Sequence, residues 1–186
     1  MMTLRIDCNL KSSNGNYGIL IDMTKIVHHS ETPAVGKQVI VACVFIHHNF
    51  DGVEKVFLAQ RAMTKKFFPG VYELPGGHID FGEDILFGLK REVREELGKD
   101  ITVGDPFSVF TYINEVKGAH AIEACYFAQF KDLLDDVSLE PDDHMNCGWF
   151  AEGEAGTYSI NRDSEDKELD VIARGFALLN GERLRV

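Results

Sequence analysis

The sequence predicts one mixed α/β domain, and three patterns support this. A run of β-branched residues at 38–46 is typical of a buried strand, and apolar residues recur with helical spacing over 83–97. Two further apolar runs around Lys117-Gly118 then suggest a hairpin. The chain has 186 residues and is 45% hydrophobic, with 13 Phe. That length and composition suit a folded domain with a small appendage.

The first 36 residues differ from the rest of the chain. Residues 4–10 and 17–23 could form two strands joined by a polar turn. Pro33 and Gly36 then break the pattern, as in a linker. We therefore divide the chain into an N-terminal extension at 1–36, which could be a β-hairpin, and a main domain at 37–186.

The main domain is expected to begin with two strands. The run at 38–46 is the first, 47–52 is expected to be a turn, and 55–61 the second strand. Residues 64–82 contain six Gly and Pro residues, a density that predicts an irregular loop.

A helix should follow that loop and end at Gly98, because glycine commonly terminates helices. Strands are then expected at 101–113, 121–130 and 146–150. The last element should be a helix capped by Asp163 or Ser164 and ending at Asn180-Gly181.

The formal net charge of −11 excludes some classes of partner. So acidic a chain is a poor ligand for the nucleic-acid backbone or for an anionic membrane surface. The N-terminus lacks the apolar run of a signal peptide, so we expect a cytoplasmic protein. Cys8, Cys43, Cys125 and Cys147 are far apart in sequence and form no C-x-x-C pair, so we expect reduced core cysteines and no zinc site.

The helix at 83–97 carries a group of carboxylates near its C-terminal end. Glu92, Glu95 and Glu96 lie three and four residues apart, which places them on one side of the helix. A solvated acidic face is the simplest interpretation. However, the helix dipole disfavours negative charge at this end, and a divalent cation such as Mg²⁺ or Mn²⁺ would offset that penalty.

These residues also match a family signature. Five residues separate Gly77 from Glu83, and seven more lead to the run Arg91-Glu92-Val93-Arg94-Glu95-Glu96-Leu97-Gly98. This resembles the signature of the Nudix (MutT-like) hydrolases, G-x5-E-x7-R-E-U-x-E-E-x-G-U, where U is bulky and aliphatic. Lys99 occupies the last position in place of an aliphatic residue. With its flanking elements, the resemblance covers roughly residues 37–180.

The resemblance implies a Nudix fold, in which a mixed β-sheet is sandwiched between α-helices. It also implies metal-dependent hydrolysis of a nucleoside diphosphate linked to another moiety, with a nucleoside triphosphate or nucleotide sugar favoured as the small-molecule substrate. Mg²⁺, or Mn²⁺, would be bound by Glu92, Glu95, Glu96 and the carbonyl of Gly76. Arg91, paired with Glu83, would orient these carboxylates.

Other roles remain open at this stage. The general base could be Glu92 or Glu95, or a residue of a later loop; the loop candidates are Glu140, Asp142, Asp143 and His144. Arg61 and Gly77 are candidate substrate-binding residues, although a lone arginine is more often a surface residue. The extension at 1–36 could contribute to the substrate pocket or to a homodimer contact.

Two other functions are compatible with the same fold. One is a non-catalytic Nudix module that senses a nucleotide. The other is an isopentenyl-diphosphate isomerase, which needs a catalytic cysteine and further metal-binding histidines. Cys43 and Cys125 are the cysteines on predicted strands, and both are expected in the core.

Overall fold

The computed structural model describes residues 33–134, 136–158, 162 and 167–182. The predicted strands at 4–10 and 17–23, and the predicted helix cap at Asp163 or Ser164, lie outside the described residues. In the part of the chain that is described, no helix is both long enough and apolar enough to span a membrane.

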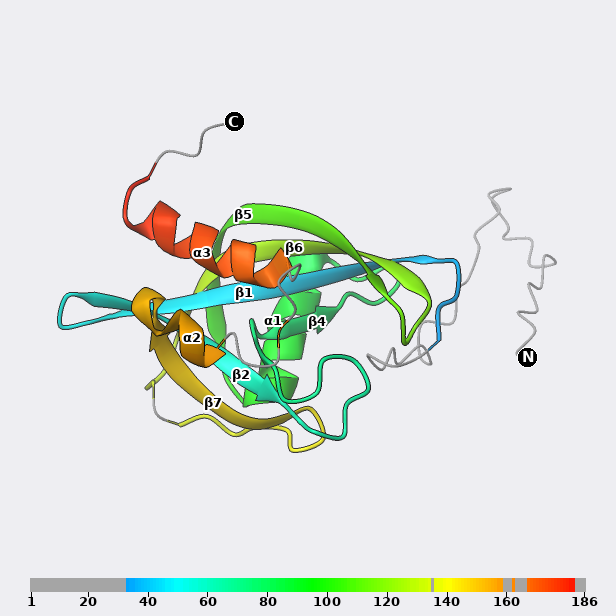
Figure 1. The fold of residues 1–186 in the computed structure, drawn as a ribbon, viewed down its shortest axis with the longest axis horizontal. Coiled ribbons are helices and arrows are strands. Elements are labelled where there is room, and N and C mark those ends of the chain that lie inside the picture. Colours follow the sequence, from blue (N-terminus) through cyan, green and yellow to red (C-terminus); the bar gives the residue numbers. More distant parts are fainter. Residues whose placement is uncertain (1–32, 135, 159–161, 163–166, 183–186) are drawn as a thin grey trace, which may run out of the picture.

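The fold is built on a seven-stranded mixed sheet (Figure 1). Its strands are β1 (Gln38–Phe50), β2 (Val53–Arg61), β3 (Tyr72–Glu73), β4 (Gly76–His78), β5 (Ile101–Asn114), β6 (Ala119–Phe130) and β7 (His144–Ala151). The order is β3-β2-β1-β6-β5, with β4 paired to β1 and β7 paired to β2. β1 and β6 are parallel, whereas the other pairs are antiparallel. The prediction of a mixed α/β domain built on a mixed sheet is confirmed.

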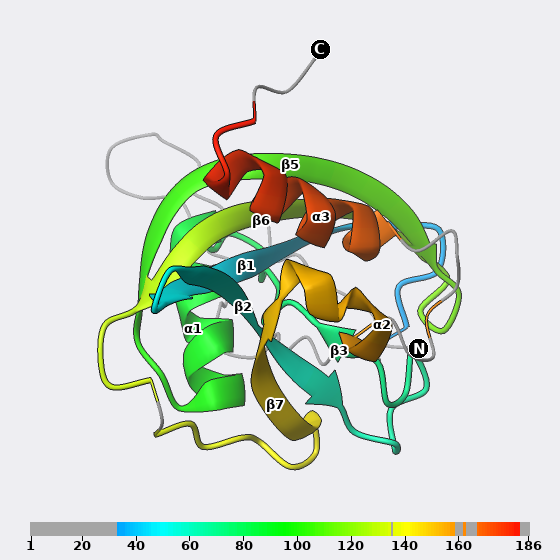
Figure 2. The same cartoon turned by 60° about the vertical axis from the view of Figure 1, so that its left-hand side comes forward.

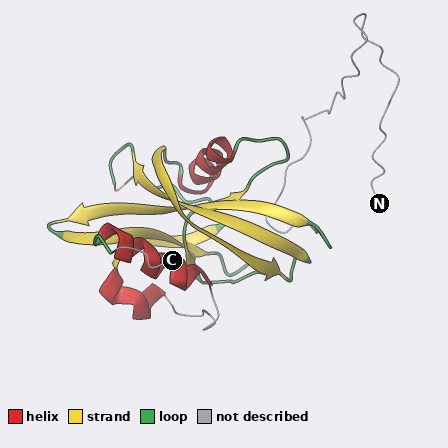
Figure 3. Ribbon diagram, turned by 90° about the horizontal axis from the view of Figure 1, so that it is seen from above, coloured by secondary structure: helices red, strands yellow, loops and turns green. Residues whose placement is uncertain are grey.

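Helices cover both faces of the sheet, as Figure 3 shows. Residues of β1 alternate between two cores, because successive side chains of a strand point to opposite faces. Val44 packs with α1 (Ile85–Leu97), and Phe45 packs with α3 (Lys167–Leu179). A short 3₁₀ helix (Glu152–Glu154) and α2 (Ala155–Tyr158) lie between β7 and α3 along the chain (Figure 2).

The first hairpin is longer than the sequence predicts. We expected a turn over 47–52, but β1 continues to Phe50 and pairs with β2 as far as Phe50 opposite Val53. The turn is only Asp51-Gly52, and both residues have positive φ, 50° and 92°. Such a two-residue turn matches the twist of the strands it joins, so the polar residues before it remain paired.

Helix α1 begins slightly later than expected and ends as predicted. Its N-cap is Asp84, whose side chain accepts hydrogen bonds from the backbone N–H of Leu86 and Phe87. Glu83 therefore precedes the helix. At the other end Gly98 has φ 64°, and its N–H donates to the carbonyl of Arg94. A left-handed glycine that closes the last turn is a common helix ending.

The later hairpin, β7 and the end of α3 agree with expectation, whereas the prediction of an irregular loop over 64–82 is wrong in part, because β3 and β4 form there by pairing with β2 and β1. The hairpin of β5 and β6 turns at Lys117-Gly118, where Gly118 has φ 67°. β7 is longer than the predicted strand at 146–150 and includes His144. α3 is followed at Asn180-Gly181 by a turn in which Gly181 has φ 79°.

Candidate active site

One cavity of about 530 Å³ is lined by residues of α1, of β4 and of strands β5 and β6. Pockets for small ligands commonly have this size. The predicted site residues that line the cavity are Arg61, Gly76, Gly77, Arg91, Glu92, Glu95, Glu96, Asp143 and His144. Glu83, Glu140 and Asp142 do not line it.

Arg91 is the centre of the carboxylate cluster. Its Nε and Nη2 donate to the two carboxylate oxygens of Glu83, at 2.9 Å each. Its Nη1 donates to Glu92 at 2.8 Å and to Glu95 at 3.0 Å. The Nη2 group also reaches the carbonyl of His78, at 3.1 Å. A planar guanidinium can make all of these bonds at once, so Arg91 fixes the positions of three carboxylates.

The two glycines of β4 allow the carboxylates to approach the sheet. A Cβ on Gly77 would lie 2.5 Å from the Glu92 carboxylate, and the N–H of Gly76 donates to Glu96 at 3.1 Å. A Cβ on Gly76 would lie 2.2 Å from the carbonyl oxygen of Ala42. At Gly76 a larger residue would collide with the backbone of β1, whereas at Gly77 it would force the Glu92 side chain to move. The lack of side chains at these two positions therefore lets strand β1 and Glu92 pack closely against β4.

Gly88 is explained in a similar way. A Cβ at this position would lie 2.6 Å from an oxygen of Glu83 and 2.9 Å from the side chain of Ile79. The close neighbours of Gly88 are therefore side chains. The glycine therefore lets Glu83 reach Arg91 across the first turns of α1.

Burial makes the inner carboxylates of α1 difficult to ionise. It raises the pKa of Glu96 well above its usual range, and the charges of Glu73 and Glu92 raise it further. Burial also raises the pKa of Glu92, although Arg91 opposes that shift. By contrast, the hydrogen bonds from Arg91 lower the pKa of Glu83.

This donor set suits a hard divalent cation. It consists of carboxylate oxygens on one side of the cavity, and Mg²⁺ and Mn²⁺ prefer oxygen ligands. A cation would also stabilise the ionised forms of Glu92 and Glu96, which burial disfavours. By donor chemistry Glu92, Glu95 and Glu96, which the resemblance implies as ligands, therefore suit the implied metal, although without a cation their oxygens do not all lie within 4.8 Å of one another.

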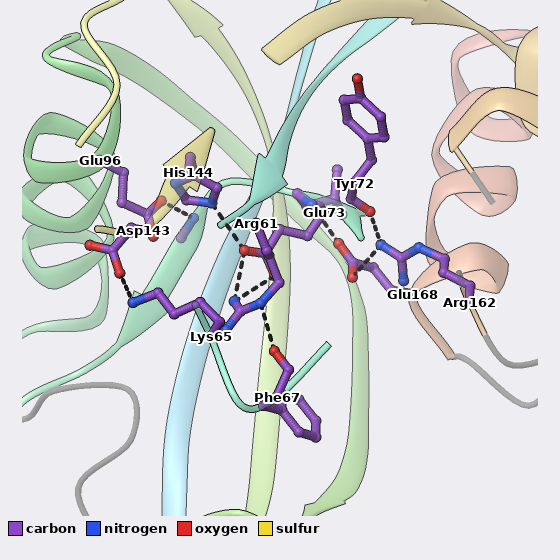
Figure 4. Close-up of polar contacts among 12 residues, drawn as sticks. Arg61, Lys65, Phe67, Tyr72, Glu73, Glu96, Asp143, His144, Arg162 and Glu168 are labelled. Carbon is purple, nitrogen blue, oxygen red and sulfur yellow. Dashed lines mark hydrogen bonds and ion pairs between the residues drawn. The ribbon is translucent and has the colours of Figure 1, made fainter. Parts of the chain in front are cut away.

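Arg61 has a carboxylate partner of its own (Figure 4). Its Nη1 donates to both oxygens of Glu73, at 2.8 and 2.9 Å, and its Nε donates to the carbonyl of Phe67. His144 Nε2 lies 3.0 Å from Glu73, so Glu73 sits between two basic groups. Burial alone would raise the pKa of Glu73, but Arg61 and His144 outweigh it and the pKa is lowered.

The later loop divides into two parts. Asp143 and His144 line the cavity, whereas Glu140 and Asp142 are exposed outside it. Asp143 forms an ion pair with Lys65, and Figure 4 places this pair beside Glu96. His144 is buried, with its side chain only 2% exposed.

The other end of the cavity is aromatic and was not predicted as a site. Phe67 and Tyr112 face each other with nearly parallel rings, at a centroid distance of 6.0 Å, and Phe110 lies nearby in the cavity wall. Glu123 lies among these residues, and burial raises its pKa to about 8. Glu73 and Glu123 were both missed. A charged residue flanked by apolar strand residues was the signal that could have indicated them.

Comparisons with known proteins agree with the signature. The model of the NUDIX domain matches residues 37–171. The nucleoside triphosphatase NudI of Salmonella schwarzengrund is 33% identical over 137 residues, which cover 67% of this chain and 90% of that protein. An isopentenyl-diphosphate Delta-isomerase of Mycolicibacterium vanbaalenii is 38% identical over 77 residues, which are 41% of this chain and only 39% of the isomerase.

Among solved structures, a C. elegans Ap4A hydrolase in a binary complex is similar to this chain, with a TM-score of 0.62 and 24% identity. The match covers 77% of this chain and 98% of the hydrolase. At this level of identity the similarity concerns the fold. Together, the signature, the domain match and the NudI relative show that the chain belongs to the Nudix family and is a hydrolase acting on phosphoanhydride bonds.

Proposed function

We propose that this protein is a metal-dependent pyrophosphohydrolase of nucleoside triphosphates or nucleotide sugars. The observation that carries the proposal is that a single cavity joins the α1 carboxylates to an aromatic end at Phe67, Phe110 and Tyr112. A nucleotide has the same two parts, a chain of phosphates and a flat base. The relationship to a nucleoside triphosphatase favours the triphosphate.

The α1 carboxylates would hold the phosphates through a divalent cation. Glu92 and Glu96, which lie against Gly77 and Gly76, are the ligands in this scheme, and the more exposed Glu95 is left for proton transfer. When bound, the cation would neutralise phosphate charge and lower the pKa of a water ligand. Without it, the acidic wall would repel the substrate.

Glu95 is the carboxylate that we assign as general base. Its side chain is 60% exposed, and the contact that positions it is the hydrogen bond from Arg91. It can therefore accept a proton from a water molecule without losing a buried contact. Glu92 and Glu96 are more buried and face the glycines. Asp143 and His144 are held by Lys65 and Glu73 instead.

Arg91 and Glu83 are positioning residues in this scheme. Glu83 does not line the cavity, but it binds two of the nitrogens of Arg91, and Arg91 in turn holds Glu92 and Glu95. The assignment of Arg61 to a substrate phosphate stays a prediction, because Glu73 and the Phe67 carbonyl already bind its Nη1 and Nε.

The proposal is tested with the purified protein, Mg²⁺ or Mn²⁺, and a panel of nucleoside triphosphates, nucleotide sugars and isopentenyl diphosphate. Chromatography of the products distinguishes the reactions. We expect a nucleoside monophosphate with pyrophosphate, or with a sugar phosphate. Isomerised isopentenyl diphosphate, or no product with any substrate and either metal, would contradict the proposal.

The base assignment needs its own measurement. Glu95→Gln should reduce kcat by about a hundredfold or more, as expected for loss of a general base. The exposed turn residue Glu115 supplies the control, since Glu115→Gln should leave kcat unchanged. If Glu95→Gln retains the wild-type kcat, Glu95 is not the general base.

A further inference from the structure

Two cysteines that are far apart in sequence meet at the floor of the cavity. Cys43 on β1 lies directly opposite Cys125 on β6 in the parallel pairing, and their sulfur atoms are 3.1 Å apart. Glu123 lies two residues before Cys125, so its side chain points to the same face of the sheet. Parallel pairing thus places two thiols and one carboxyl group together.

The three side chains form a compact and buried group. Potential ligand atoms of Cys43, Glu123 and Cys125 all lie within 4.8 Å of one another. Within the described ranges, no other set of three His, Cys, Asp or Glu side chains meets that condition. Their exposed fractions are 2%, 8% and 0%, and Cys43 and Glu123 line the cavity. A small ion can therefore reach this group from the cavity.

We propose that Cys43, Cys125 and Glu123 form a binding site for a thiophilic divalent cation of the zinc and cadmium class. Two sulfur ligands select against Mg²⁺, which prefers oxygen. The carboxylate supplies the third ligand. Because Cys43 and Glu123 line the cavity, a water molecule would supply the fourth ligand from there, as in zinc sites with three protein ligands.

The geometry requires only a small rearrangement. With metal–sulfur bonds of about 2.3 Å, two sulfurs of a tetrahedral site are about 3.8 Å apart. The sulfurs of Cys43 and Cys125 must therefore separate by about 0.7 Å from their present contact. Rotation about the Cα–Cβ bonds is enough for a shift of that size.

Binding is an exchange of protons for the cation. Each thiol that becomes a ligand loses its proton to solvent and forms a metal–sulfur bond, and the Glu123 carboxyl loses its proton in the same way. No oxidation is involved. Burial raises the pKa of Cys43, so this thiol is protonated before the cation arrives.

This inference does not depend on the proposed hydrolysis. The Nudix carboxylates offer oxygen ligands, whereas this group offers sulfur, and the two can be filled separately. We therefore titrate Cd²⁺ into the full chain with excess Mg²⁺ and a non-thiol reductant present. The readout is the ultraviolet charge-transfer band of a cadmium–thiolate bond, together with the stoichiometry. Cys8→Ser serves as the background, because Cys8 lies outside the described residues.

We expect one Cd²⁺ per chain, with the thiolate band. Cys43→Ser and Cys125→Ser should each weaken binding by about tenfold or more. Glu123→Gln should also weaken it, whereas Glu115→Gln should not. Cys147→Ser is the matched control, because Cys147 is on β7 and is not part of the group; this variant should bind as the background does.

Several results would overturn the proposal. One is absence of the thiolate band in the background protein. Another is Cd²⁺ affinity in the Cys43→Ser and Cys125→Ser variants that is unchanged from the background. A third is a loss of affinity in Cys147→Ser as large as that in the other two variants. Circular dichroism of every variant shows whether it folds. If one serine variant does not fold, the other serine variant and Glu123→Gln decide the question.

Discussion

The pair between Glu83 and Arg91 offers the sharpest test of how the site is built. Glu83→Gln keeps the shape of the side chain beside Gly88 but removes its charge. The pair has two hydrogen bonds of 2.9 Å, and the side chains are 12% and 25% exposed. Hydrogen bonds to charged groups contribute about 1.5–3 kcal/mol each, and partial exposure reduces the Coulombic part. We therefore expect a loss of about 2 kcal/mol in the free energy of unfolding.

Urea unfolding at pH 7 without metal measures this loss, and a thermal scan should show a melting temperature lower by about 4–8 °C. The loss should also depend on pH. Because Arg91 lowers the pKa of Glu83, the pair stabilises the fold above the carboxyl group's unfolded-state pKa. That contribution disappears as the pH falls through the folded-state pKa, so the wild type and Glu83→Gln should converge in acid.

The same urea experiment can contradict the stabilising role of the Glu83–Arg91 pair. Equal urea midpoints at pH 7, or a difference that does not shrink in acid, would show that the pair does not stabilise the fold. Glu115→Gln, in an exposed turn, should leave the midpoint unchanged. The double variant Glu83→Gln with Arg91→Lys should lose less than the sum of the two single variants, because each removes the same bonds.

Other variants test the glycines and the buried carboxylate. Glu96→Gln should raise the metal-free urea midpoint at neutral pH and abolish stabilisation by Mg²⁺. Burial raises the pKa of Glu96, so ionising this carboxyl group lowers the free energy of unfolding of the wild type, and that loss is complete once the pH has risen through the folded-state pKa. A lower midpoint, or retained Mg²⁺ stabilisation, would contradict that reasoning. Gly76→Ala should lower the free energy of unfolding by about 3 kcal/mol or more, because a Cβ collides with Ala42 and φ is +144°. Gly52→Ala also has positive φ but meets no atom within 4 Å, so it should cost only about 1–2 kcal/mol, and equal urea midpoints for the two variants would refute the collision.

Local patterns in the sequence were enough to predict most elements of the fold. The periodic apolar residues and Gly98 identify α1, and Gly118 marks the β5–β6 turn. The end of β1 was missed because His47, His48 and Asn49 are polar and are held by pairing with β2. Strand ends of this kind depend on the partner strand and carry little signal of their own.

The site was predictable where its residues lie within one continuous motif. The spacing from Glu83 to Glu96 indicates a cluster, and Arg91 joins it as expected. The ion pair of Arg61 with Glu73 spans 12 residues, and the contact of Cys43 with Cys125 spans 82. Such pairs depend on strand register, which no local pattern in a single sequence specifies.

The central claim is that the α1 carboxylates hold the divalent cation that hydrolysis requires. The most direct test is the rate of nucleoside triphosphate cleavage as a function of Mg²⁺ for the wild type and Glu92→Gln. The wild type should require Mg²⁺, and Glu92→Gln should be slower by about a hundredfold or more at every concentration. Equal rates for the two proteins, or full activity without a divalent cation, would contradict the claim.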